Sequence, residues 1–161
     1  MKINSFFITF CVIPFVGFTQ AKEPKRQVLA CVGDSITQGV GAERGQSWPA
    51  QAQKILGKKW RVQNFGLSGT TLMNSGNKPY QKSQQFKDAL SSNPDVVVIM
   101  LGTNDTKPAN WRHSAKDYEA DYRDLISDFQ KLASKPRIYL CLPPYIACLL
   151  YTSPSPRDYT R

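Results

Sequence analysis

The chain has 161 residues, of which 21 are basic and 12 acidic, giving a formal net charge of +9 at pH 7. This length allows one domain with a real hydrophobic core. The charge raises the question of nucleic-acid binding, but the basic residues are scattered, and the densest group is only Lys58-Lys59-Trp60-Arg61. Without a basic stripe, a solvated basic surface is the better interpretation, and we expect no nucleic-acid partner. Such a surface would still suit an acidic polysaccharide or an anionic cell envelope.

The N-terminus has the layout of a secretory signal peptide, which we predict over residues 1–21. Lys2 supplies a positive charge, an apolar stretch covers Phe6–Phe18, and a cleavage point follows Ala21. The apolar stretch is short for a membrane span. We therefore expect a secreted or periplasmic protein with no stable membrane span after cleavage, and a retained N-terminal anchor is the alternative.

The four cysteines have no metal-binding spacing, and we expect neither a metal nor a cofactor. Cys31 and Cys141 lie in apolar runs and are predicted to be small buried hydrophobic side chains. Cys11 would leave with the signal peptide, and Cys148 lies in an atypical tail.

The first half of the domain reads as strand, helix and strand. A strand over residues 28–32 runs into the sequence Gly33-Asp34-Ser35-Ile36-Thr37-Gln38-Gly39. A helix follows from a Ser47 cap to a stop at Gly57, and a second strand is expected over residues 59–65. The predicted apolar face of this helix consists of Trp48, Ala52, Ile55 and Leu56.

The second half repeats the alternation. A polar loop over residues 67–80 leads to a helix over 81–90, and a strand is expected over residues 95–101 that is apolar at every position after Asp95, as in a buried parallel strand. Ser114 and Asp117 resemble a capping box before a helix that ends near Ala133. A fourth strand is expected over residues 136–142. The predicted buried face of the last helix consists of Tyr118, Tyr122, Leu125, Phe129 and Leu132.

This order of elements predicts an α/β sandwich with a parallel sheet. The strand C-termini then share one edge, where ligands bind in such sheets. Three glycine-bearing motifs follow three of the strands: Gly33-Asp34-Ser35, Asn64-Phe65-Gly66 and Gly102-Thr103-Asn104-Asp105. We therefore expect the three motifs to meet.

A serine held at such an edge can act as a nucleophile on an ester. The tetrahedral oxyanion needs donors, and the N–H groups of Ser35 and Gly66 and the side-chain amide of Asn104 can supply them. The alternative interpretations are structural. Ser35 or Thr37 would cap the next helix, Gly66 would be a turn glycine, and Asn104 would hold its own loop.

These motifs resemble the first three blocks of the SGNH (GDSL-type) esterase family, and the resemblance extends from about Val28 to Pro144. It implies a flavodoxin-like three-layer sandwich in which Ser35 is the nucleophile and Gly66 and Asn104 complete the oxyanion hole. It also implies that Asp34 and Asp105 brace their loops. Within the family, the chain looks most like bacterial carbohydrate esterases and sialate O-acetylesterase-like proteins.

The family's last block, an Asp-x-x-His that activates the serine, is absent. The chain has one histidine, His113, and the residue three before it is Asn110. We therefore expect a partial esterase domain over residues 22–145 that is nearly inactive as written. The tail over residues 146–161 resembles a read-through artefact, with a disordered tail as the alternative.

The function expected from the resemblance is hydrolysis of an acyl ester, such as an acetyl group on a carbohydrate, through an acyl-Ser35 intermediate. The substrate would be a small-molecule or glycan ester. A secreted, non-catalytic glycan-binding module on an esterase-like scaffold is the rival hypothesis.

Overall fold

A parallel sheet organises residues 25–143, the part of the chain that the computed structural model describes. Its strands are β1 (Gln27–Gly33), β2 (Trp60–Gly66), β3 (Val96–Met100) and β4 (Arg137–Leu140), in the spatial order β2-β1-β3-β4. All three neighbouring pairs are parallel. The predicted α/β class is therefore confirmed, while the expected signal peptide and tail lie outside the described residues.

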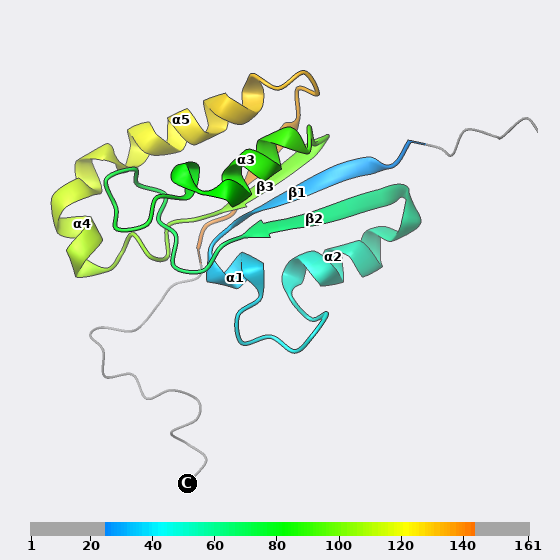
Figure 1. The fold of residues 1–161 in the computed structure, drawn as a ribbon, viewed down its shortest axis with the longest axis horizontal. Helices are drawn as coiled ribbons and strands as arrows, with labels where there is room; N and C mark the ends of the chain where they lie inside the picture. Colours follow the sequence, from blue (N-terminus) through cyan, green and yellow to red (C-terminus); the bar gives the residue numbers. More distant parts are fainter. Residues whose placement is uncertain (1–24, 144–161) are drawn as a thin grey trace, which may run out of the picture.

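Helices cover both faces of the sheet, which gives the predicted three layers (Figure 1). On one face, α3 (Gln84–Ser91) and α5 (Tyr118–Gln130) pack on β1 and β3. On the other face lie α1 (Ser35–Gln38) and α2 (Trp48–Leu56), and Trp48 packs with Leu29 and Cys31 of β1. Because β1 is covered on both sides, all of its residues after Gln27 are buried.

Asp95 ties the starts of three strands together. Its Oδ2 accepts a hydrogen bond from Val28 N–H of β1 at 2.7 Å. Its backbone N–H donates to Val28 O at 2.9 Å, and its carbonyl accepts from Arg137 N–H of β4 at 3.1 Å. This one residue therefore helps to fix the register of β1, β3 and β4, and the register decides which residues lie level at the opposite edge of the sheet.

The buried face predicted for α5 is confirmed. Leu125 and Phe129 are fully buried, and Tyr118, Tyr122 and Leu132 pack against the same core. The face predicted for α2 is wrong at its second half, because Ile55 is 83% exposed and Leu56 is 36% exposed.

Helix α2 is held instead by its first turn and by a polar side chain. Pro49 is buried, and Gln53 Oε1 accepts from Val62 N–H of β2 at 2.9 Å while its Nε2 donates to Trp60 O at 3.2 Å. These bonds turn the Gln53 side of α2 toward the sheet. Ile55, two positions further along a helix, therefore points away from it.

The predicted capping box at Ser114 and Asp117 is also wrong. Ser114 is the last residue of a further helix, α4 (Pro108–Ser114), and a 3-10 turn over Ala115–Asp117 separates α4 from α5. Asp117 occupies the N-cap position of α5 without a side-chain capping bond. Pro108 at the first position of α4 is the signal for this helix, since proline there loses no hydrogen bond.

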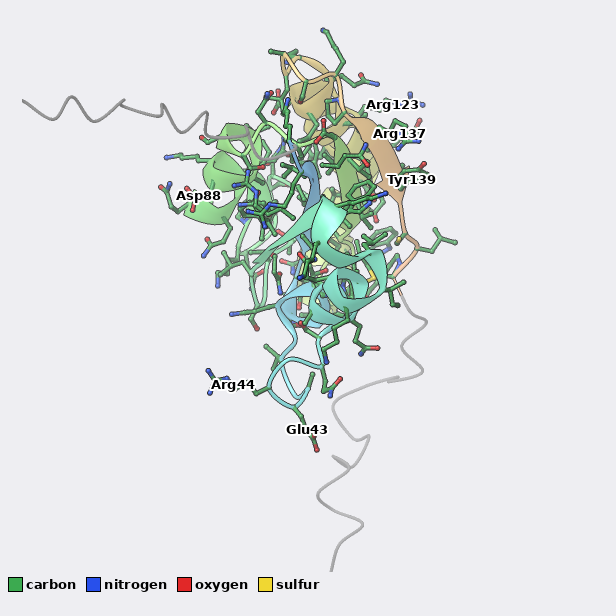
Figure 2. The ribbon with its side chains drawn as sticks, turned by 90° about the vertical axis from the view of Figure 1, so that its right-hand side faces the viewer. Glu43, Arg44, Asp88, Arg123, Arg137 and Tyr139 are labelled. Carbon is green, nitrogen blue, oxygen red and sulfur yellow. The ribbon has the colours of Figure 1, made fainter. Side chains whose placement is uncertain are left out.

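β4 is one of the two edge strands of the described sheet. Figure 2 shows Arg137 and Tyr139 directed outward from it, and Tyr139 and Leu140 are 52% and 53% exposed. Cys31 is fully buried as predicted, whereas Cys141, just after β4, is only partly buried. Within residues 25–143, no helix combines the length and the apolarity that crossing a bilayer requires.

Candidate functional site

The strands that carry the three motifs end at the same height along the sheet. Gly33 at the end of β1 is in register with Gly66 of β2 on one side and with Met100 of β3 on the other. Leu67 N–H donates to Gly33 O at 2.9 Å, which joins the first two motifs directly. The expectation that the motifs meet at one edge is therefore confirmed.

Ser35 is the first residue of α1, immediately beyond this edge. Asp34, not Ser35 or Thr37, is the N-cap, and its Oδ1 accepts from Ile36 N–H at 2.9 Å. Ser35 itself is partly exposed, and no group within residues 25–143 is hydrogen-bonded to its Oγ. The capping alternative for Ser35 is thus excluded, and its hydroxyl is available to a ligand.

The turn that presents Ser35 is tightly packed. Thr37 is fully buried and its Oγ1 accepts from Trp48 Nε1 at 3.3 Å. A β-carbon on Gly33 would collide with Thr37 Oγ1 and would lie 2.6 Å from Met100 O. Glycine at position 33 therefore lets α1 close directly over the strand ends.

Gly66 has a structural task at this edge. A β-carbon there would collide with the main chain of Thr37 and Gln38, so this glycine allows β2 to approach α1. Its N–H donates to Asn64 Oδ1 at 2.9 Å. Asn64 is also bonded to α1, since its Nδ2 donates to Thr37 O at 2.9 Å. An oxyanion would have to compete with Asn64 Oδ1 for the Gly66 amide, and the role of Gly66 in an oxyanion hole stays a prediction.

Gly69, in the loop that follows β2, has a backbone N–H with no hydrogen-bond acceptor among residues 25–143. Its φ is +79°. A β-carbon there would meet only Lys78 Cδ, at 3.8 Å. Among the candidate oxyanion donors predicted from the sequence, Gly69 was absent, although it lies only three residues after Gly66.

Asn104 is 7% exposed and held from two sides. Its Nδ2 donates to Thr70 O at 3.0 Å, and its carbonyl accepts from Asn110 Nδ2 at 2.8 Å. A primary amide carries two N–H groups, so one remains for a ligand after the bond to Thr70. Because Asn104 is held by other elements, the alternative in which it caps only its own loop does not describe its bonding.

Asp105 braces the loop that follows β2, as the resemblance implies. Its carboxylate is fully buried and accepts from Leu72 N–H at 2.9 Å and from Met73 N–H at 2.8 Å. Burial raises the pKa of Asp105, and the nearby charge of Asp34 raises it further, against the lowering effect of the two N–H donors. Asp34 Oδ2 is buried without a partner among the described residues.

The sequence position that could offer His113 an orienting carboxylate holds an amide instead. His113 lies in α4, and Asn110, three residues earlier, is an amide that is 4% exposed. Asn110 Oδ1 accepts from Asn77 N–H at 3.0 Å, and its Nδ2 donates to Asn104 O, so it joins two loops. Over residues 25–143, no three His, Cys, Asp or Glu side chains gather in a group that could hold a metal.

Comparisons with known proteins identify the family of the chain. The model of the GDSL-like lipase/acylhydrolase family matches residues 31–161. An acetylxylan esterase of Xylanibacter ruminicola is 41% identical over 140 residues, which cover 74% of this chain and 29% of that protein.

Solved structures give the same answer for the fold. AlinE4, an SGNH-hydrolase family esterase, has a TM-score of 0.57 at 26% identity, over 74% of this chain and 60% of its own. An aryl esterase of M. smegmatis has a TM-score of 0.59 at 25% identity, over 73% and 64%. The chain thus spans less than a third of the acetylxylan esterase and about three fifths of these structures. Because the family model matches residues 31–161, the chain belongs to the GDSL-like lipase/acylhydrolase family.

Proposed function

We propose that the protein represented by this chain is a serine-dependent carboxylic ester hydrolase. The observation that carries the proposal is the placement of Ser35. Its partly exposed hydroxyl has no partner among the described residues and stands at the strand edge that also carries Asn104. Family membership and the esterases among its structural relatives support the same reaction class.

The reaction divides into two transfers. Ser35 Oγ bonds to the acyl carbon as its proton passes to a base, and the alcohol leaves with a proton. Water then attacks the acyl-Ser35 ester, which releases the acid and returns a proton to Ser35. Both transfers pass through an oxyanion, which the Ser35 N–H and the Asn104 side chain would stabilise.

A third donor would come from the end of β2 or from the loop that follows it. The Gly66 N–H can serve once the Asn64 side chain releases it, and the Gly69 N–H can serve without such a release. One donor is typically worth about 100- to 1,000-fold in kcat, so this choice matters for the rate.

The described residues offer no clear general base for Ser35. His113 is the one histidine of the chain, and the position that would hold an orienting carboxylate is occupied by Asn110. An unactivated serine is a poor nucleophile near neutral pH. We therefore propose that the 161-residue chain turns over esters slowly.

The substrate we propose is an acetyl ester on a carbohydrate, met outside the cytoplasm. The support is the 41% identical acetylxylan esterase. A second candidate function is a module that binds glycans without cleaving them. It is favoured by the hydrogen bond from Gly66 N–H to Asn64 Oδ1, because this bond occupies an amide that the oxyanion would need.

Hydrolysis of p-nitrophenyl acetate tests the proposal, with imidazole added as an external base. We compare the chain with Ser35→Ala and with Ser68→Ala, an exposed serine on the neighbouring loop. We expect little turnover alone and an imidazole-dependent increment, above imidazole in buffer, that only Ser35→Ala abolishes. Robust Ser35-dependent turnover without imidazole would show that the chain has its own base. An increment that survives in Ser35→Ala would remove Ser35 as the nucleophile.

A further inference from the structure

Trp111 is a large aromatic side chain left 45% exposed beside the candidate site. It lies in α4, the helix that directly follows the Gly102–Thr106 loop. The other two tryptophans, Trp48 and Trp60, are partly buried against the cluster of Leu29, Cys31 and Val96. An exposed indole so close in the chain to Asn104 needs a physical explanation.

The position of Trp111 is fixed relative to Asn104. Its neighbour Asn110 is buried and donates from Nδ2 to Asn104 O at 2.8 Å. The backbone N–H groups of both Asn110 and Trp111 donate to Lys107 O at 2.9 Å. One side of this turn is therefore anchored to the residue proposed to bind the oxyanion, and Trp111 is the next residue in the chain after that anchor.

The indole is also supported from behind. The ring centroids of Trp111 and Tyr118 are 5.9 Å apart at 62°, and those of Tyr118 and Tyr122 are 6.0 Å apart at 63°. Tyr118 reaches the motif itself, since a β-carbon on Gly102 would lie 2.5 Å from its hydroxyl oxygen. The rings of Trp111, Tyr118 and Tyr122 thus form a row that reaches Gly102 of the third motif, and we call it the aromatic row.

Open space borders the same row. Tyr118 and Tyr122 line a cavity of about 300 Å³, together with Ile126 of α5 and Leu140 of β4. A ligand longer than one ring therefore has room beside the aromatic row.

The surroundings of Trp111 suit a sugar better than a protein partner. Lys107, Arg112 and Lys116, which lie near it in the chain, are all exposed, so charged side chains flank the indole. Protein interfaces on soluble domains usually need a larger continuous apolar patch. A pyranose ring has one face rich in C–H groups and hydroxyls at its rim, so it can stack on an aromatic face while its hydroxyls stay solvated.

We propose that Trp111 is a stacking platform for a pyranose ring of the polysaccharide that carries the scissile ester. The proposal rests on the ester-hydrolase function proposed above and names its substrate class. The platform would hold the glycan next to the Asn104 loop, so that an acyl group on a neighbouring sugar reaches Ser35.

Binding is measured with xylohexaose, an unacetylated chain of pyranose rings, so that no hydrolysis is needed. Titration is followed by calorimetry and by tryptophan fluorescence. We expect the 161-residue chain to bind and its emission to change. Trp111→Ala should raise Kd about tenfold, and Trp111→Phe should recover most of the affinity. Ile55→Ala is the matched control, since Ile55 is 83% exposed on α2 across the sheet, and it should bind like the parent.

The outcomes separate this inference from the proposed function. Absence of xylohexaose binding by the parent, or equal binding by folded Trp111→Ala, would overturn the platform and leave the Ser35 assay untouched. If xylohexaose binding depends on Trp111 but Ser35 proves inert, the glycan-binding proposal stands and the ester-hydrolase proposal is rejected. Circular dichroism of each variant establishes that it is folded.

Discussion

The main chain of Gln38 occupies the space that a β-carbon on Gly66 would need. β2 and α1 are therefore in backbone contact at the point where the first two motifs leave the sheet. Gly66→Ala should lower the free energy of unfolding by more than about 3 kcal/mol, because main chain cannot step aside as a flexible side chain can. Urea unfolding followed by circular dichroism measures the change.

Gly41→Ala provides the comparison for this prediction. Gly41 has a φ of +83°, and no atom lies within 4 Å of the point that a β-carbon would occupy, so alanine meets only backbone strain there. We expect a cost of about 1–2 kcal/mol. A smaller loss for Gly66→Ala than for Gly41→Ala would contradict the close contact between β2 and α1.

Asp105→Asn tests the carboxylate that braces the loop after β2. The amide can accept one hydrogen bond but presents N–H groups where Leu72 or Met73 now finds an acceptor. The loss should be about 1–3 kcal/mol in unfolding free energy. Asp88→Asn on the exposed side of α3 should change it by no more than about 0.5 kcal/mol. Equal effects of the two substitutions would be inconsistent with a bracing role.

The raised pKa of Asp105 makes a further prediction about pH. A carboxyl whose pKa is raised above its ordinary value of 3.8 binds its proton more tightly in the folded chain than in the unfolded one. Its contribution to stability is present below that value and is lost as pH rises through the folded-state pKa. The stability difference between the parent and Asp105→Asn should therefore shrink from about pH 4 upward. A difference that grows over this range would mean that the folded state favours the ionised carboxylate.

Cys31 should resist alkylation in the native chain. Burial raises the pKa of its thiol to about 12, so the reactive thiolate is scarce and shielded. With iodoacetamide at about pH 8, peptide mass spectrometry should find Cys31 unlabelled and the partly buried Cys141 labelled. In guanidinium both should react. Rapid native labelling of Cys31 would show that β1 is not closed over by helices on both faces.

Local sequence patterns predicted the sheet and its chemistry-bearing edge. The apolar run before Gly33 and the run after Asp95 each specify a buried parallel strand, and the glycines that end them mark the loops. The helical spacing of Leu125 and Phe129 likewise identified the buried face of α5. These features depend on neighbours within a few residues, which a single sequence displays.

Features that depend on distant partners were not predicted. Gln53 docks α2 through hydrogen bonds to β2, which no apolar pattern indicates, and so Ile55 was wrongly placed in the core. Asn110 bonds to Asn104 and also to Asn77, which is more than thirty residues away in the chain. From the sequence, Asn110 was notable only because it stands where the family pattern would require an aspartate. The bond from Gly66 N–H to Asn64 Oδ1 is local, but only the folded turn reveals that this amide is engaged.

The most direct test of the central claim is to locate the acyl group on the protein. The chain is incubated with p-nitrophenyl acetate and imidazole, quenched in acid and analysed by peptide mass spectrometry. Without a base of its own the chain should deacylate slowly, so the account predicts an acetyl group on Ser35 that is absent from Ser35→Ala. Acetylation confined to other residues, at the same level in both proteins, would contradict Ser35 as the nucleophile.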